Sequence, residues 1–184
     1  MTHSLADTNV VLIIANGFNE AEFTEIQRAL LKAGAKIKTV APENSLANGW
    51  LGKGWGHYFP VDQNITEALA SDYDQMILVG GERGVAKLQQ NPHTKRMVGH
   101  FLDAHKPLIA INEAVSLLSL PGKITGRAIA ANPDDAQMIA HGAKLSDEGI
   151  VTDGPLMTTR SNDIAVVVAA VLSHLAETRE LVAA

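Results

Sequence analysis

The stretch NVVLIIA, residues 9–15, is a short, continuous run of apolar and largely β-branched side chains. A run of this length without polar alternation is typical of a strand that is buried on both faces of a sheet. Comparable strands are predicted over residues 36–41, 75–79 and 107–111. Helices with apolar residues at helical spacing are predicted between them, over residues 20–33 and from 91 to about 105. Buried strands that alternate with helices predict an α/β fold with a mostly parallel sheet covered on both faces.

The rest of the chain continues this pattern. A hairpin or ordered loop is expected at 42–60, short helices at 62–70 and from Asn112 through Leu118, a strand at 127–130, a helix at 134–141, a strand pair within 150–159 and an apolar helix at 162–177. No internal repeat, low-complexity segment or linker divides the sequence. We therefore expect residues 1–184 to form one domain, a length that is sufficient to bury a sizeable core.

Composition narrows the possible functions. Aromatic residues make up only 4% of the chain, so the core must be aliphatic, and the formal net charge of −5 gives no electrostatic reason to bind nucleic acid or an anionic membrane. No apolar stretch reaches membrane-spanning length and no signal peptide is recognisable, so we expect a cytoplasmic protein. The absence of cysteine excludes disulfides, thiolate ligands and thiol nucleophiles. The seven histidines show no metal-ligand spacing, so no metal site is expected.

Four segments occur in an informative order: GFNEAEF at 17–23, WGHYFPVD at 55–62, LVGG at 78–81 and DGPLMTTR at 153–160. Together they resemble the PfpI/ThiJ superfamily, and in particular its PfpI-type branch of intracellular-protease-like and general stress proteins. The similarity extends from about residue 9 to about residue 175. It implies a flavodoxin-like three-layer α/β/α sandwich, and it implies a homo-oligomer, either a dimer or a larger assembly.

The chain departs from this family at the turn that follows the strand at 107–111, which we call the elbow. Where the family has Ala-Ile-Cys-His-Gly-Pro, this sequence has AINEAV at 110–115, so Asn112 replaces the nucleophilic cysteine and Glu113 replaces the histidine. An amide cannot form the thiolate that the family chemistry needs. The resemblance therefore implies a protein without cysteine-dependent activity, which is stress-related or binds a small ligand. Asn tolerates left-handed backbone better than most residues, so we expect the elbow geometry to persist.

Two carboxyl groups are expected near the elbow. Glu22 matches the family carboxylate that faces the nucleophile, and Glu113 follows Asn112 directly. Two carboxyls in one apolar cleft do not easily both ionise, so one would hold a proton. This pair could serve as acid and base on a small carbonyl or amide substrate. Alternatively, both are satisfied polar groups, or carboxylates favoured by a helix N-terminus.

Four further residues are candidates for ligand contacts. The resemblance implies that Gly80 and Gly81 direct a backbone N–H into the cleft as part of an oxyanion hole, although a tight turn would also require glycine. Such a cleft would take a small anionic or carbonyl ligand. His57 lies in the aromatic loop, from which it could reach the cleft, and Arg160 could pair with a carboxylate or cap the sheet edge. Ser116 lies one helical turn beyond the elbow without a matching histidine, which makes it a poor nucleophile.

The remaining candidates concern a cofactor and an interface. Glu20 and Glu22 would repel the phosphate of a flavin after the first strand, so we expect no cofactor. Trp50, Trp55 and Tyr58 could line a pocket, but aromatic side chains are also enriched in protein interfaces. We expect these three to pack within their loop or in an oligomer interface.

Overall fold

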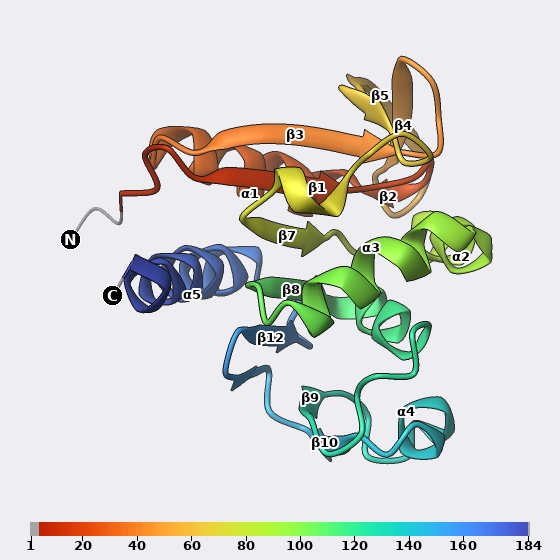
Figure 1. Cartoon of the computed structure of the whole chain (residues 1–184). Helices are drawn as coiled ribbons and strands as arrows, with labels where there is room; N and C mark the ends of the chain where they lie inside the picture. Colours follow the sequence, from red (N-terminus) through yellow and green to blue (C-terminus); the bar gives the residue numbers. More distant parts are fainter. Residues whose placement is uncertain (1–3, 184) are drawn as a thin grey trace.

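A seven-stranded sheet forms the centre of the computed structural model, which describes residues 4–183 (Figure 1). The strands are ordered β11 (Ile150–Asp153), β12 (Leu156–Thr159), β8 (Leu108–Ile111), β7 (Gln75–Leu78), β1 (Asn9–Ile13), β3 (Lys36–Ala41) and β6 (Gln63–Asn64). Every neighbouring pair is parallel except β11 with β12, which form an antiparallel hairpin. The predicted mostly parallel sheet is confirmed.

Both faces of the sheet are covered, as the continuous apolar strands require. Along β1, Val11 and Ile13 join one apolar cluster, whereas Val10 and Leu12 join a second cluster on the opposite face. Helices α2 (Glu82–Gln90) and α3 (Pro92–Asp103) supply side chains to the first cluster. Helices α1 (Glu20–Lys32) and α5 (Ile164–Ala183) supply side chains to the second. The three-layer α/β/α sandwich is therefore confirmed.

Local sequence sets the helix ends. The Asn19 side chain caps α1 by accepting a hydrogen bond from the Glu22 N–H at 3.2 Å, and Gly34 follows the helix with φ of 86°. The Asn91 side chain accepts from the His93 N–H at 2.9 Å, with proline at the first helical position of α3. Within residues 4–183, no helix has both the length and the apolar character that crossing a membrane requires.

Two smaller sheets flank the main one. Strands β4 (Leu46–Trp50) and β5 (Trp55–Pro60) form the predicted hairpin, and β2 (Phe18–Asn19) pairs with β4. Strands β9 (Ala128–Ala130) and β10 (Lys144–Ser146) form a parallel pair, with α4 (Ala136–Ala140) between them in the chain. These additions place a hairpin beside the start of α1 and a second lobe beside the elbow (Figure 1).

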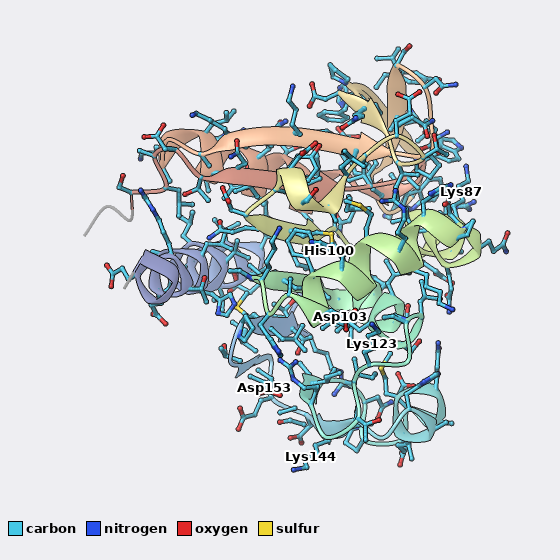
Figure 2. All side chains as sticks on the ribbon, in the orientation of Figure 1. Lys87, His100, Asp103, Lys123, Lys144 and Asp153 are labelled. Atoms are coloured by element: carbon cyan, nitrogen blue, oxygen red, sulfur yellow. The ribbon has the colours of Figure 1, made fainter. Side chains whose placement is uncertain are left out.

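Asp153, which is labelled in Figure 2, attaches this second lobe to the sheet. Its carboxylate accepts hydrogen bonds from the Ala128 N–H and from Arg127 Nε, both at 2.9 Å. These contacts, and the nearby charge of Lys144, lower the pKa of Asp153, with the Ala128 N–H as the largest cause. Farther along β12, the Ala130 N–H donates to the buried Thr158 hydroxyl at 2.8 Å. The DG turn of the sequence thus positions one wall of the site described below.

Two predicted elements differ from the structure, and one helix of the structure was not predicted. The helix expected at 62–70 is wrong, because backbone hydrogen bonds from Asp62 to Thr39 and from Ile65 to Ala41 extend the chain as β6, and only a 3₁₀ turn, η1 (Ala70–Asp72), follows. The helix after residue 111 is present, but as the 3₁₀ helix η2 (Asn112–Ser119). Helix α2 was not predicted, because its sequence ERGVAKLQQ offers only Val85 and Leu88 as buried large apolar side chains.

Candidate functional site

The elbow lies where β8 ends and η2 begins. Asn112 adopts φ of 52°, in the left-handed region that only a few residue types tolerate. The prediction that the elbow geometry persists without cysteine is therefore confirmed. Glu22 from α1 and the glycine pair after β7 lie at the same edge of the sheet, because parallel strands end together there.

Both polar atoms of the Asn112 side chain form hydrogen bonds with other residues of the chain. Its Oδ1 accepts from the Ser161 N–H at 2.9 Å and from the Thr159 hydroxyl at 3.3 Å. Its Nδ2 donates to the Ser161 carbonyl at 3.0 Å and to Glu22 Oε2 at 3.4 Å. The amide thus joins β8 to the segment between β12 and α5. Ser161 was not predicted as part of the site, although it directly follows the DGPLMTTR segment.

Glu22 is a buried carboxyl group with only 2% of its surface exposed. Its Oε1 accepts the Gly80 N–H at 2.7 Å. Burial, and secondarily the Glu113 carboxylate, raise the pKa of Glu22 from its ordinary value of 4.5 to about 7, although the hydrogen bonds from Gly80 and Asn112 act against the shift. Glu22 therefore changes its charge close to neutral pH.

Glu113 lies beside it but is exposed to solvent. Its Oε2 accepts the Gly81 N–H at 3.0 Å, where Gly81 adopts φ of 109° and begins α2 as its N-cap. A Cβ at Gly80 would lie 2.7 Å from Glu113 Oε2 and 3.0 Å from Glu22 Oε1, so glycine is required for this close approach. Both glycines direct N–H groups toward the cleft, but the chain's own carboxylates accept them.

A cavity of about 530 Å³, which we call the elbow cavity, opens beside these groups. Its lining includes Asn112, Glu113, Ser116, Asn132, Asp147 and Arg160. The Ser116 hydroxyl donates to the Glu113 carbonyl at 2.9 Å, and nothing in the described chain activates it as a nucleophile. Arg160 is exposed and forms no ion pair within residues 4–183, so its guanidinium remains available to a ligand.

A second cavity of about 430 Å³, which we call the hairpin cavity, lies on the other side of Glu113. Trp50 and Leu51 from the hairpin line it together with Gly81 and Glu113. The Arg83 guanidinium lies 4.2 Å from the centre of the Trp50 ring and holds this wall in place. Trp50 therefore lines the hairpin cavity, whereas Trp55 and Tyr58, which are 54% and 69% exposed, line a separate cavity of about 360 Å³ with Asn16 and Asn48.

His57 lies outside this group of residues. Its Nδ1 is 2.5 Å from Glu20 Oε1, and its backbone N–H donates to Glu20 Oε2 at 2.8 Å. Glu20 is itself buried, and an added Cβ at Gly56 would lie only 1.7 Å from its Oε2. His57 and Glu20 thus hold the hairpin against the start of α1. In the described part of the chain, no group of three or more His, Asp or Glu side chains could hold a metal ion.

The family model described as "DJ-1/PfpI family" matches residues 8–173. The chain belongs to the DJ-1/PfpI family. An uncharacterized protein of Methanocaldococcus jannaschii is 25% identical over 88% of this chain and 79% of its own length. An uncharacterized protein of Staphylococcus aureus is 28% identical over 84% of this chain and 90% of its own. The family resemblance read from the four sequence segments is confirmed.

Solved structures agree with this assignment. A two-domain protein of Anabaena variabilis, with DJ-1/ThiJ/PfpI-like and ferritin-like domains, superposes with a TM-score of 0.81 at 27% identity over 91% of this chain. The chain spans about half the length of that protein. A ThiJ/PfpI domain protein of Brachyspira murdochii gives a TM-score of 0.80 at 22% identity, over 91% of this chain and 95% of its own. Within the DJ-1/PfpI family, this chain is a member whose elbow carries asparagine.

Proposed function

We propose that this DJ-1/PfpI protein is a non-catalytic, stress-related member of the family that binds a small polar ligand in the cytoplasm. The observation that carries the proposal is the set of hydrogen bonds formed at the elbow. Asn112 supplies no nucleophile, and its amide is bonded to Ser161, Thr159 and Glu22. The two N–H groups that would stabilise an oxyanion are already accepted by carboxylates.

The elbow cavity is the proposed ligand site. Its lining combines amides and hydroxyls with the Arg160 guanidinium and the carboxylates of Glu113, Asp135 and Asp147, a polar combination that can orient a small molecule without reacting with it. Arg160 provides the positive charge that a ligand carboxylate or carbonyl would meet. The ligand class is therefore a small anionic or carbonyl compound.

The charge of Arg160 should control binding in this cavity. We expect Arg160→Met to weaken ligand binding at least tenfold, because the substitution removes the guanidinium and keeps much of the apolar side chain. Small carboxylic acids and aldehydes can be titrated into the labelled protein while the amide signals of Asn112 and Ser161 are followed. Lys95→Met is the matched control, because it removes one positive charge from an exposed position that lines neither cavity. Equal losses in both variants would refute a specific role for Arg160.

One observation favours a second function. A carboxyl with a pKa of about 7 beside a second carboxylate is suited to act as acid or base on a small carbonyl or amide substrate. Assays with methylglyoxal, a simple amide and a fluorogenic peptide distinguish the non-catalytic function from the enzymatic one. The non-catalytic proposal requires rates equal to the buffer blank. Turnover that is lost in both Glu22→Gln and Glu113→Gln would establish the enzyme instead.

We further propose that the protein is a homo-oligomer. The hairpin exposes Leu46, Leu51, Trp55 and Tyr58, each with more than half of its surface accessible, and aromatic residues of this kind are enriched in interfaces. Sedimentation of the full chain is expected to give at least twice the monomer mass. A monomer at micromolar concentration would contradict this part of the proposal.

A further inference from the structure

The side chain of Glu113 is the shared wall of two cavities. It lines both the elbow cavity and the hairpin cavity, which have volumes of about 530 and 430 Å³. Arg160 lies in the first cavity, and Trp50 and Gly81 lie in the second. If the Glu113 side chain rotated outward, the two cavities would meet at the Gly81 N–H.

Little holds Glu113 in this position. Its carboxylate has one hydrogen bond within residues 4–183, the 3.0 Å contact with the Gly81 N–H. Glu22, in contrast, is 2% exposed and accepts from both Gly80 and Asn112. Because the Glu113 side chain is already exposed to solvent, its rotation away from Gly81 costs little hydration and releases rotamer freedom, whereas the buried Glu22 has no such route. Of the two carboxylates, only Glu113 is placed to leave.

We propose that the Glu113 side chain is a displaceable plug between the two cavities, and that the carboxylate of a small ligand replaces it on the Gly81 N–H and so joins the two cavities. This inference rests on the proposed ligand-binding function and identifies the ligand class and the atom that receives it. The exchange is balanced, since one carboxylate leaves the Gly81 N–H and another takes the same hydrogen bond. The remainder of the ligand would extend into the elbow cavity toward Arg160, which no other charged group in the described chain neutralises by an ion pair.

The proposal predicts that removal of the plug creates a carboxylate site. Sodium formate is titrated into the full-length ¹⁵N-labelled protein, with sodium chloride at equal ionic strength as the reference, and the Gly81 amide signal is followed. We expect a saturable shift in Glu113→Ala at formate concentrations at least tenfold below those needed in the wild type. In the wild type the same signal should move only at higher concentration, because formate must compete with Glu113.

Three variants separate a plug from a simple charge effect. Glu82→Gln removes a negative charge from the exposed neighbour of Gly81, which also lines the hairpin cavity, but it leaves Glu113 in place and should not enhance binding. Glu113→Gln keeps an acceptor of the same length and should bind formate less well than Glu113→Ala. Glu113→Asp shortens the side chain by one methylene but keeps its charge, so it should bind formate better than the wild type and less well than Glu113→Ala, which provides a second test if the alanine variant folds poorly.

The outcomes are distinct. An unmoved Gly81 amide in both Glu113→Ala and Glu113→Asp would overturn the plug, as would equal enhancement in Glu82→Gln. Neither result would affect ligand binding reported through Arg160, Asn112 and Ser161. Conversely, catalytic turnover by the wild type would overturn the proposed function and leave the formate result standing.

Discussion

Glu22→Gln is expected to make the protein more stable at pH 8 by roughly 3 kcal/mol while leaving its stability near pH 4 almost unchanged. The pKa of Glu22 is raised from 4.5 to about 7 in the folded state, chiefly by burial. Between pH 4.5 and pH 7 the folded protein therefore binds more protons than the unfolded chain. Its free energy of unfolding therefore falls as the pH rises through this range. Glutamine resembles the protonated carboxyl group and does not ionise, so the free energy of unfolding of the variant does not show this decrease.

Urea unfolding at several pH values from 4 to 8 measures this effect. Glutamine keeps an oxygen that can accept the Gly80 N–H, and the contact it alters, with Asn112, is the longest of the group at 3.4 Å. Glu25→Gln is the control, because Glu25 lies on the same helix but forms only an exposed pair with Arg28. If wild type and Glu22→Gln lost stability in parallel from pH 4.5 to 7, the raised pKa would be wrong.

Asn112→Ala is expected to lower the free energy of unfolding by about 3 kcal/mol. The amide makes hydrogen bonds to Ser161 N, Ser161 O and the Thr159 hydroxyl, and alanine would leave these part-buried groups without that partner. Alanine must also adopt φ of 52°, which costs an L-residue about 1 kcal/mol more than glycine.

A second substitution divides this loss into its two causes. Asn112→Gly removes the same hydrogen bonds but accepts the left-handed conformation freely, so it should be about 1 kcal/mol more stable than Asn112→Ala. Chemical denaturation of the three proteins at one pH provides both differences. Equal stabilities for wild type and Asn112→Gly would show that the bonds to residues 159–161 contribute nothing.

Much of the fold could be predicted because its signals are local. The continuous apolar runs at 9–15 and 107–111 required strands buried on both faces, and Asn19 and Asn91 marked helix starts by capping geometry. The short helix expected at 62–70 failed because pairing with β3 overrode local preference. Such pairing depends on a strand distant in the sequence.

The candidate site was predictable only in part. The positive φ at Asn112 followed from the residue type at a strand-to-helix turn, and the nearness of Glu22 and Glu113 followed from the family resemblance. Sequence could not indicate which carboxylate accepts which glycine N–H, because that depends on rotamers set by tertiary packing. Nor did the sequence indicate that Glu20 is buried. Glu20 is buried because the hairpin packs over it. The His57 side chain contacts Glu20 and therefore does not reach the elbow.

The asparagine at the elbow also affects how the protein reacts with oxidants. A low-pKa thiol at such a turn is readily converted by peroxide to sulfenic and then to sulfinic acid. Here that position holds an amide, and the chain has no cysteine elsewhere. Met76, Met97, Met138 and Met157, the methionines of the described chain, are each at most 1% exposed. Residues 4–183 therefore present no accessible sulfur, and peroxide concentrations that would modify an exposed reactive thiol leave the elbow chemically unchanged.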